Sequence, residues 1–431
     1  MLKLQEFLIS DVHARMVLDS RGRPTVEVEV RTRGGGFGRA AAPAGASKGK
    51  HEALELRDGG KEFRGYGVRK AVENVNRIIG PKLIGLDSRN QKEIDYLMCE
   101  LDGTPNKSKL GANAIVATSL AVAKAAASTA CLPLYRYLGG PNAYLMPVPM
   151  LNIINGGVHA GNELAFQEFM IVPVGADKFS EALRIAVEVY YELKDVLKKK
   201  YGALAVNVGD EGGFAPPMKT SREALDALMK AINNAGYSES EVVLALDVAA
   251  SQIYKDGKYY VDGMSLDAEE LLEYYLQLFN EYPIKSVEDP FMEEDYEYFK
   301  MLTAKVKGRV LVVGDDLYTT NPLRLRKGIE MKATTAILVK VNQIGTLTET
   351  LQVVDMAHKA GMRTIISHRS GETEDTTIAH LAVAVRSGLI KTGAPARGER
   401  TAKYNELLRI EEELGDQAEY PGADIFKIMT V

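Results

Sequence analysis

The sequence predicts an α/β protein with two domains, a C-terminal eight-fold α/β (TIM-like) barrel and a smaller N-terminal α+β domain. Three observations predict this fold. The chain has 431 residues, more than one ordinary small core organises. Its first third combines one strand-like segment with helical periodicity, and the rest repeats short apolar runs separated by helical stretches. Many alternating strands and helices in one domain favour parallel βαβ units closed into a barrel.

The N-terminal third begins with a sheet-like pattern. Residues 24–33 alternate polar and apolar side chains, which is typical of a half-buried antiparallel strand. The glycine-rich residues 34–38 then predict a hairpin turn. Residues 44–49 are small and flexible, and they predict a mobile loop that acts as a lid.

Helical periodicity follows from about residue 68 to residue 130. Its last part is alanine-rich and stops before Pro133, a strong helix signal. The Gly-Gly-Pro-Asn cluster at 139–142 breaks this pattern. We therefore expect an N-terminal domain over residues 1–139 and the barrel over residues 140–431.

Six short apolar runs in the second domain predict barrel strands. Near-continuous apolar strands fit a sheet that is buried on both faces. The runs cover residues 243–247, 284–288, 310–315, 336–340, 364–368 and 389–391. Each ends in a polar or charged residue, namely Asp247, Glu288, Asp315, Lys340, His368 and Lys391. The carboxyl ends of barrel strands converge on one mouth, where active sites lie, so these residues are predicted to face one another.

Composition excludes several classes of function. The net charge is −5 with both signs interspersed, which leaves no basic surface for nucleic acid or an anionic membrane. The N-terminus lacks the layout of a signal peptide, and no apolar run has the length needed to span a bilayer. Two cysteines make no disulfide framework, which favours a reducing compartment. We therefore expect a cytoplasmic protein.

Three of the strand-end residues predict a metal site. Asp247, Glu288 and Asp315 would bring three carboxylates to one point, where they would repel one another unless a cation is present. An all-oxygen ligand set without thiols favours Mg²⁺ over Zn²⁺. The alternative is that these are three unrelated acids at the rim of the barrel.

Two strand-end lysines predict a general base. A lysine accepts a proton only when it is neutral, so its pKa must be lowered by nearby cations or by burial. We expect Lys340 and Lys391 to end strands on the side of the mouth opposite the carboxylates, with metal ions and the second lysine supplying that environment. A solvent-exposed surface lysine is the alternative for Lys340 alone.

Further polar residues lie between apolar or glycine-rich neighbours. Glu211 follows Asp210 and precedes two glycines, and an acid opposite a lysine base would give two groups of contrasting role. Glu168 lies within a strand-like segment, where a charge is costly unless it faces a polar site. His159 lies in a glycine-rich loop, where a structural role is the alternative. The run at 367–372 contains His368, Arg369 and Ser370 and suits phosphate binding.

Together these segments resemble the enolase family over essentially the whole chain. The similar segments are DSRG at 19–22, PTVE at 24–27, GAS at 45–47, Gly49, HEALE at 51–55, NGG at 155–157, QEFM at 167–170, GDEGG at 209–213, VEDP at 287–290, GDDL at 314–317, KVNQIG at 340–345, SHRSGETED at 367–375 and KYNELLRI at 403–410. Any one of these short segments is weak evidence for the family, but the ordered set is highly specific.

The resemblance implies an enzyme that interconverts 2-phosphoglycerate and phosphoenolpyruvate. It implies that Asp247, Glu288 and Asp315 hold one Mg²⁺ and that a second Mg²⁺ arrives with substrate, bound partly by Ser47 on the closing loop. It further implies the following roles: Lys340 as base, Glu211 as acid, Arg369 and Ser370 on the phosphate, Lys391 near the carboxylate, and His159, Gln167, Glu168 and His368 completing the pocket. In this family a lysine acts as the base and Mg²⁺ stabilises the intermediate, which illustrates how a protein tunes the pKa values of its acid and base.

The resemblance also implies self-association. Members of the family are homodimers or larger homo-oligomers such as octamers, and Arg15 is expected to reach Glu413 of a partner subunit. The chain departs from the family pattern at Arg23, Ala44, Lys48, Val158 and Gly398. None of these positions is assigned to chemistry, although two of them flank the lid.

Two other functions stay open on the sequence alone. One is a different enzyme of the same superfamily, such as a racemase or cycloisomerase acting on another carboxylate. The phosphate-binding run at 368–370 and Glu211 favour the phosphorylated substrate instead. The other is a structural or surface-binding protein that keeps the fold without turnover.

Overall fold

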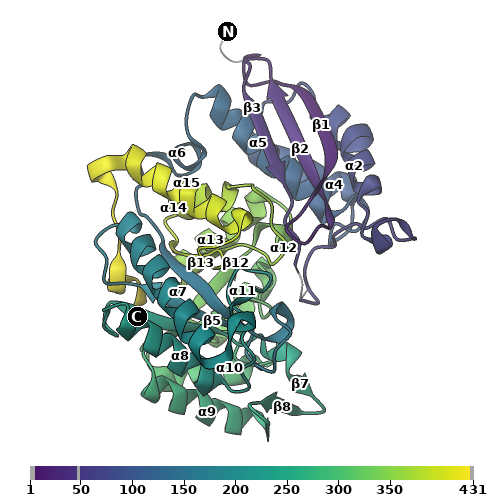
Figure 1. Ribbon diagram of the computed structural model, residues 1–431. Coiled ribbons are helices and arrows are strands. Elements are labelled where there is room, and N and C mark those ends of the chain that lie inside the picture. Colours follow the sequence, from purple (N-terminus) through teal and green to yellow (C-terminus); the bar gives the residue numbers. More distant parts are fainter. Residues whose placement is uncertain (1–4, 46–48, 428–431) are drawn as a thin grey trace.

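The computed structural model describes residues 5–45 and 49–427. Two bodies make up the molecule, a small sheet with helices on one side and a larger barrel (Figure 1). The residues predicted as lid ligand and lid neighbour, Ser47 and Lys48, lie outside the described residues.

The first body contains a three-stranded antiparallel sheet. Its strands are β1 (Ile9–Leu18), β2 (Pro24–Thr32) and β3 (Phe37–Ala41), in the order β1-β2-β3. The register pairs Val12 with Val30 and Val28 with Ala40, so the inward side chains of neighbouring strands meet. The predicted strand and the turn after it are therefore confirmed.

Helices follow this sheet along the chain, as the helical periodicity predicted. They are α2 (Arg69–Asn74), a π-helical turn (Val75–Ile79), α3 (Gly80–Leu83), α4 (Gln91–Asp102), α5 (Ala112–Thr129) and α6 (Leu134–Gly139), with a 3-10 turn at Glu62–Gly65. The alanine-rich α5 is buried along almost its whole length and packs against β2 and β3. Among the described residues no single helix is long and apolar enough to cross a membrane, whereas α5 and residues 134–142 meet that test together as a pair bent by 93°.

The close approach of α5 to β3 requires a glycine in the strand. A Cβ atom at Gly38 would lie 2.1 Å from the Ala121 carbonyl oxygen and 2.4 Å from the Ala125 backbone nitrogen. Both contacts are with helix backbone, so neither can rotate away. The helix–sheet distance in this domain is therefore set by the absence of a side chain.

We expect Gly38→Ala to reduce the free energy of unfolding by about 3 kcal/mol, because overpacking forces the helix off the sheet. Thermal or denaturant unfolding measures this change. Gly398→Ala is the control, since its Cβ would meet no atom within 4 Å, and it should change stability by less than about 0.5 kcal/mol. Equal stability of the two variants would contradict the packing argument.

The second body is a closed eight-stranded barrel, as the sequence predicted. Its strands are β4 (Val148–Asn155), β5 (Glu168–Pro173), β6 (Val242–Asp247), β10 (Ile284–Glu288), β11 (Leu311–Gly314), β12 (Ala336–Val339), β13 (Arg363–Ser367) and β14 (Gly388–Lys391), in the order β10-β11-β12-β13-β14-β4-β5-β6. The six predicted runs correspond to β6 and β10 to β14. Side chains inside the barrel are buried and apolar, which fits a sheet covered on its outer face by helices.

One feature of the barrel differs from the predicted parallel βαβ pattern. Strand β5 runs antiparallel to both of its neighbours, β4 and β6. The other neighbouring pairs in the barrel are parallel. The amino end of β5 therefore lies at the mouth where the other strands have their carboxyl ends.

The helices of this body are α7 (Phe179–Tyr201), α8 (Ser221–Asn234), α9 (Ala268–Glu281), α10 (Tyr296–Val306), α11 (Pro322–Met331), α12 (Val341–Ile344), α13 (Leu347–Lys359), α14 (Thr377–Ala384) and α15 (Gly398–Leu414). A small sheet of β7 (Tyr254–Lys255), β8 (Lys258–Val261) and β9 (Met264–Leu266) projects from the barrel (Figure 1). Short 3-10 turns lie at Gly140–Asn142, Gly157–His159, Ala203–Val206, Ala250–Gln252, Gly415–Gln417 and Gly422–Phe426. The exact domain boundary at residues 139 and 140 stays a prediction.

The two bodies are joined by buried polar contacts as well as by the chain. The Asp95 carboxylate accepts the backbone N–H of Thr348 at 2.9 Å, and the Ser119 hydroxyl accepts that of Leu347 at 3.0 Å. These are free N–H groups of the first turn of α13, so side chains of the small domain satisfy a helix end of the barrel. The segment after β12 is thereby held from both domains.

Candidate active site

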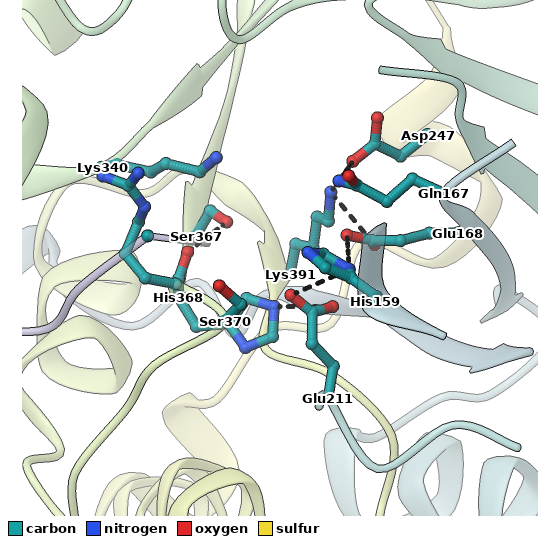
Figure 2. Close-up of a pocket in the computed structure, with 12 residues that line it drawn as sticks. His159, Gln167, Glu168, Glu211, Asp247, Lys340, Ser367, His368, Ser370 and Lys391 are labelled. Carbon is teal, nitrogen blue, oxygen red and sulfur yellow. Dashed lines mark hydrogen bonds and ion pairs between the residues drawn. The ribbon is translucent and has the colours of Figure 1, made fainter. Parts of the chain in front are cut away.

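A small polar cavity lies at the mouth of the barrel. Its lining combines carboxylates, cationic groups and hydroxyls from many strand ends (Figure 2). The lining residues are Gly45, His159, Gln167, Glu168, Glu211, Asp247, Lys340, Ser367, His368, Arg369, Ser370 and Lys391. Most of the predicted site residues therefore meet in one place, although their assigned roles stay predictions.

The reversed strand β5 explains how Glu168 reaches this cavity. Glu168 is the first residue of β5 and pairs with Asn155 at the end of β4 and with Asp247 at the end of β6. The Gln167 side-chain amide donates to Asp247 Oδ2 at 3.3 Å. In a parallel strand this glutamate would lie at the far end of the barrel.

The three predicted metal ligands follow three adjacent strands, β6, β10 and β11. Glu288 pairs in register with Asp247, and burial together with the charge of Asp247 raises the pKa of Glu288 well above its ordinary value. One oxygen, Glu288 Oε1, is buried without a hydrogen-bond partner among residues 5–45 and 49–427. Such crowded and unsatisfied carboxylate oxygens are a suitable environment for a hard cation.

Lysine ammonium groups lie among these carboxylates. The Lys391 Nζ atom lies 2.9 Å from Asp247 Oδ2, 2.8 Å from Glu288 Oε2 and 3.1 Å from Glu168 Oε2. These anions outweigh the effect of burial and raise the pKa of Lys391 well above its ordinary value. Strand β14 lies across the barrel from β6, β10 and β11, as predicted for Lys391, and the lysine side chain extends from it to the carboxylates.

Lys340 likewise pairs with a predicted metal ligand. It follows β12, which neighbours β11 in the barrel, and its ammonium group donates to Asp315 Oδ2. Burial lowers the pKa of Lys340, but attraction to Asp315 outweighs it and leaves the pKa above its ordinary value. The nearest charge to Lys340 in this structure is therefore an anion, and the lowered pKa expected beside metal ions stays a prediction.

Sequence reasoning assigned no role to Asp289, which lies beneath the predicted metal ligands. Its buried carboxylate accepts the backbone N–H groups of Asp315 at 2.9 Å and Asp316 at 2.7 Å. Its φ of 41° is unusual for a residue other than glycine. Carboxylate oxygens of Asp289, Asp315 and Asp316 lie within 4.8 Å of one another. The sequence feature that could have indicated a role for Asp289 is the pair of acidic dipeptides at 288–289 and 315–316.

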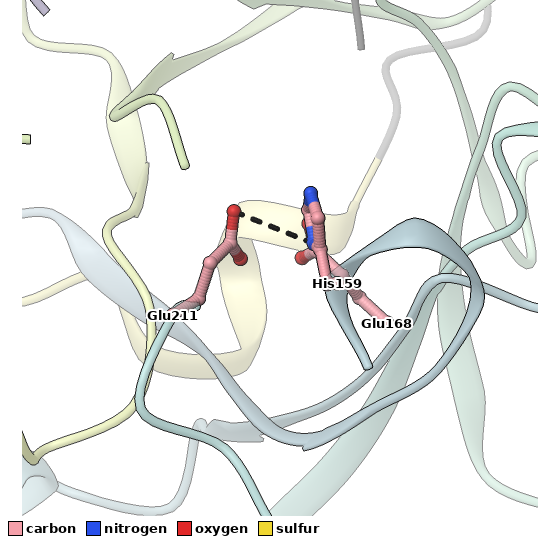
Figure 3. A group of neighbouring side chains, drawn as sticks. All are labelled: His159, Glu168 and Glu211. Atoms are coloured by element: carbon pink, nitrogen blue, oxygen red, sulfur yellow. Dashed lines mark ion pairs between the residues drawn. The ribbon is translucent and has the colours of Figure 1, made fainter. Parts of the chain in front are cut away.

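Across the cavity from Lys340, two carboxylates face an imidazole (Figure 3). His159 Nδ1 lies 3.6 Å from Glu211 Oε1 and 3.8 Å from Glu168 Oε1. The Asn152 amide donates to Glu211 Oε2 at 3.0 Å, and His368 Nε2 lies 3.4 Å from the same oxygen. Glu211 is therefore surrounded by groups that stabilise its charged form.

The pKa values of the two glutamates are shifted in opposite directions. Burial and the charge of Glu211 raise the pKa of Glu168 well above its ordinary value. Burial also opposes charge on Glu211, but His159, His368 and Arg400 outweigh it and hold the pKa of Glu211 well below its ordinary value. Two titratable groups with pKa values pushed apart are typical of acid–base sites. The pKa values of these two neighbouring carboxyl groups are thus shifted in opposite directions, and the assignment of Glu211 as the acid stays a prediction.

The residues that are predicted to bind phosphate are held in place by side chains of the N-terminal domain. The Arg369 guanidinium contacts Glu52 Oε2 at 2.9 Å and Oε1 at 3.1 Å, and it donates to Asn342 Oδ1 at 3.1 Å. The Arg21 guanidinium lies 3.5 Å from the Ser370 hydroxyl. Sequence reasoning missed Glu52 because its partner is 317 residues away in the chain.

A glutamine after β12 connects the same elements. The Gln343 amide donates to Asp315 Oδ1 at 2.9 Å, and its carbonyl accepts the Thr320 hydroxyl at 2.8 Å. Its backbone carbonyl accepts the N–H of Ala53, next to Glu52. One residue thus connects a predicted metal ligand to the segment that holds Arg369.

We expect Glu52→Gln to raise KM for the phosphorylated substrate about tenfold, because the Arg369 guanidinium loses its ionised partner and its fixed orientation. Breaking this buried ion pair should also lower the free energy of unfolding by about 3 kcal/mol. Steady-state kinetics and denaturant unfolding measure the two effects.

Glu62→Gln is the matched control, since Glu62 pairs with Arg69 at 3.0 Å on the surface. It should leave both quantities nearly unchanged. An unchanged KM in Glu52→Gln would contradict the positioning of Arg369 by Glu52.

Comparison with known proteins agrees with this architecture. The model of the enolase C-terminal TIM barrel domain matches residues 143–429, and that of the enolase N-terminal domain matches residues 9–138. Similar curated proteins, each named enolase, include those of Methanocaldococcus jannaschii, Thermococcus gammatolerans and Pyrococcus furiosus. The first is 65% identical over 411 residues, covering 95% of this chain and 96% of the relative. The others are 62% identical over 419 and 423 residues, covering 96% and 97% of this chain and 97% and 98% of each relative.

Fold and site thus define a barrel enzyme that acts on a carboxylate substrate, and the chain belongs to the enolase family. Its activity is that of phosphopyruvate hydratase, a lyase that reversibly dehydrates 2-phospho-D-glycerate to phosphoenolpyruvate, the enolase step of glycolysis. Identity at this level over nearly the whole chain disfavours both the racemase or cycloisomerase alternative and a purely structural role.

Proposed function

We propose that Lys340 and the Glu168–Glu211 pair are the base and acid of the dehydration. The observation that carries this proposal is the placement of Lys340 and the two glutamates on different sides of one cavity (Figure 2), which Arg369 and Ser370 also line. Lys340 removes the proton from the carbon beside the substrate carboxylate. The glutamate pair supplies the proton with which the hydroxyl group leaves as water, so one C–H bond and one C–O bond break while the C=C bond forms.

The remaining residues bind and orient the substrate. Arg369 and Ser370 hold the phosphate, Lys391 lies near the carboxylate, and Gln167, His159 and His368 complete the pocket. Each of these groups is fixed by protein contacts before substrate arrives, which is the arrangement that stabilises developing charge most effectively. Restriction of water in a small cavity strengthens these interactions further.

We propose Mg²⁺ as the metal, held by Asp247, Glu288 and Asp315. The all-carboxylate donor set, the unpartnered Glu288 Oε1 and the raised pKa of Glu288 support a hard divalent cation here. Two Mg²⁺ ions per site, the second partly on Ser47, would neutralise the carboxylates and the negative charge that develops on the substrate. Lys340 can lose its proton and act as base only when its attraction to Asp315 is reduced.

We further propose a cytoplasmic enzyme whose partners are small molecules and further copies of itself, as a homodimer or a larger homo-oligomer such as an octamer. In the structure Arg15 pairs with Glu27 at 2.7 Å and Glu29 at 2.9 Å within its own chain. Contact with Glu413 of a partner subunit would add to this network or replace part of it. A sedimentation profile containing only monomer would count against the assembly.

The test of the function is a direct assay. Purified protein is mixed with 2-phosphoglycerate and Mg²⁺, and the ultraviolet absorbance of the enol product is followed. We expect turnover that EDTA abolishes and added Mg²⁺ restores. Turnover that survives EDTA would refute the metal requirement, and turnover of a non-phosphorylated acid in preference to 2-phosphoglycerate would refute the phosphate site.

A further inference from the structure

Arg400 is a fully buried arginine that does not line the cavity but contacts two segments that do. It lies in the first turn of α15 and has no exposed surface. Its guanidinium donates to His368 Nδ1 at 2.7 Å, to the Arg369 carbonyl at 2.6 Å, to the Asp210 carbonyl at 3.0 Å and to the Ser370 carbonyl. One cation thus fixes the backbone beside Glu211 and the whole 368–370 run.

The contact with His368 determines which ring nitrogen carries the proton. A guanidinium has only N–H donors and stays charged at all accessible pH values. His368 Nδ1 must therefore be an unprotonated acceptor, so the neutral ring carries its proton on Nε2. That N–H faces Glu211 Oε2 at 3.4 Å. An imidazolium would place an N–H against the guanidinium, with two cations side by side in a buried site.

Other charges around the ring act in both directions. Glu211 favours a protonated imidazole, whereas Arg400 and Lys391 oppose it. Burial is the largest influence, and together these groups lower the pKa of His368 to about 3. His368 is therefore neutral at physiological pH.

We propose that Arg400 is a positioning residue that locks His368 as its Nε2–H tautomer, pointed at Glu211, while it holds the backbone of the phosphate-contacting residues. It acts through these groups and touches no substrate itself. The inference rests on the proposed roles of Glu211, Arg369 and Ser370, but the tautomer does not depend on turnover. Without Arg400 the ring is free to take the other tautomer or a second proton.

The first test is the protonation state of His368 in the unmodified protein. Long-range ¹H–¹⁵N spectra of ¹⁵N-histidine-labelled protein at pH 7 distinguish the two tautomers and the imidazolium. The chain has six histidines, and the missing signals of a His368→Gln variant assign this one. We expect the Nε2–H tautomer. An Nδ1–H tautomer or an imidazolium overturns the proposal.

The second test compares two substitutions of Arg400. Lysine is also only a donor, so Arg400→Lys should keep the Nε2–H tautomer. The amide of Arg400→Gln can accept, so this variant should show Nδ1–H or imidazolium signals. The acid limb of its kcat/KM profile should move upward by at least one pH unit, because His368 then gains a proton closer to neutrality. An unchanged tautomer and an unchanged acid limb in Arg400→Gln overturn the proposal.

Lys403→Gln is the matched control for loss of a buried cation in α15. Lys403 is also fully buried, and it donates to Glu372 Oε2 at 3.0 Å and to the Thr373 carbonyl at 2.6 Å, but it does not contact His368. Its loss should lower the melting temperature without changing the His368 tautomer. If Lys403→Gln and Arg400→Gln change the His368 signals equally, Arg400 is merely structural. If instead the proposed enzymatic roles are wrong, variants of Glu211 and Arg369 will stay active, and the His368 spectrum will be unchanged.

Discussion

Lys340→Ala should reduce kcat at least a thousandfold while the protein still folds. A positioned general base contributes a factor of about 10² to 10⁴, and Lys340 is the cationic side chain next to Asp315 on the side of the cavity away from the glutamates. Folding should survive because the Gln343 amide still donates to Asp315 at 2.9 Å. The assay follows the enol product in excess Mg²⁺, and circular dichroism checks the fold.

Lys359→Ala is the control for this loss. Lys359 is an exposed lysine of α13 that pairs with Asp355 at 2.6 Å on the surface, so its removal should leave kcat unchanged. Activity of Lys340→Ala within tenfold of the unmodified protein would refute its assignment as the base. A collapsed fold with no Mg²⁺-dependent recovery would instead place Lys340 in a structural role.

Lys391→Met should show a large loss of stability that depends on metal. Its Nζ atom lies within 3.1 Å of carboxylate oxygens of Glu168, Asp247 and Glu288. Removing a cation that lies among three buried carboxylates costs about 3–5 kcal/mol. A divalent cation would offset part of this cost, so we expect a much lower melting temperature in EDTA and a partial recovery in Mg²⁺.

The matched control is Lys305→Met, which removes a surface lysine that pairs with Glu273 at 2.7 Å. A surface pair contributes about 0–1 kcal/mol, and EDTA should not change that figure. Equal effects of the two substitutions in EDTA would contradict the compensating role of Lys391. Recovery of Lys305→Met alone by Mg²⁺ would contradict the location of the metal.

Much of the barrel could be predicted because each buried strand is a short apolar run ending in a functional group. The runs at 243–247 and 284–288 match β6 and β10 almost residue for residue. Periodicity says nothing about direction, however, and so the antiparallel course of β5 was not predicted. The direction follows from pairing with β4 and β6, which is a property of the folded sheet.

Only part of the site could be predicted, for a similar reason. Residues at strand ends, such as Asp247 and Lys391, were found because the barrel topology gathers them. Glu52 and Arg400 were missed because their roles arise from partners distant in the chain, Arg369 and His368. The contact of Lys340 with Asp315 was also not predicted, since it depends on which charge is nearest in space.

Closure of the barrel between β14 and β4 has a consequence for synthesis of the protein on the ribosome. Leu389 pairs with Val148 and Lys391 with Met150, so the strand that seals the barrel is also its last. The N-terminal sheet and its helices can fold early, as domains do during translation. The catalytic mouth cannot exist until residues up to 391 have emerged, and its 368–370 run is not fixed until α15 follows. A nascent chain that stalls before this point therefore exposes an open sheet edge and an incomplete set of buried charges.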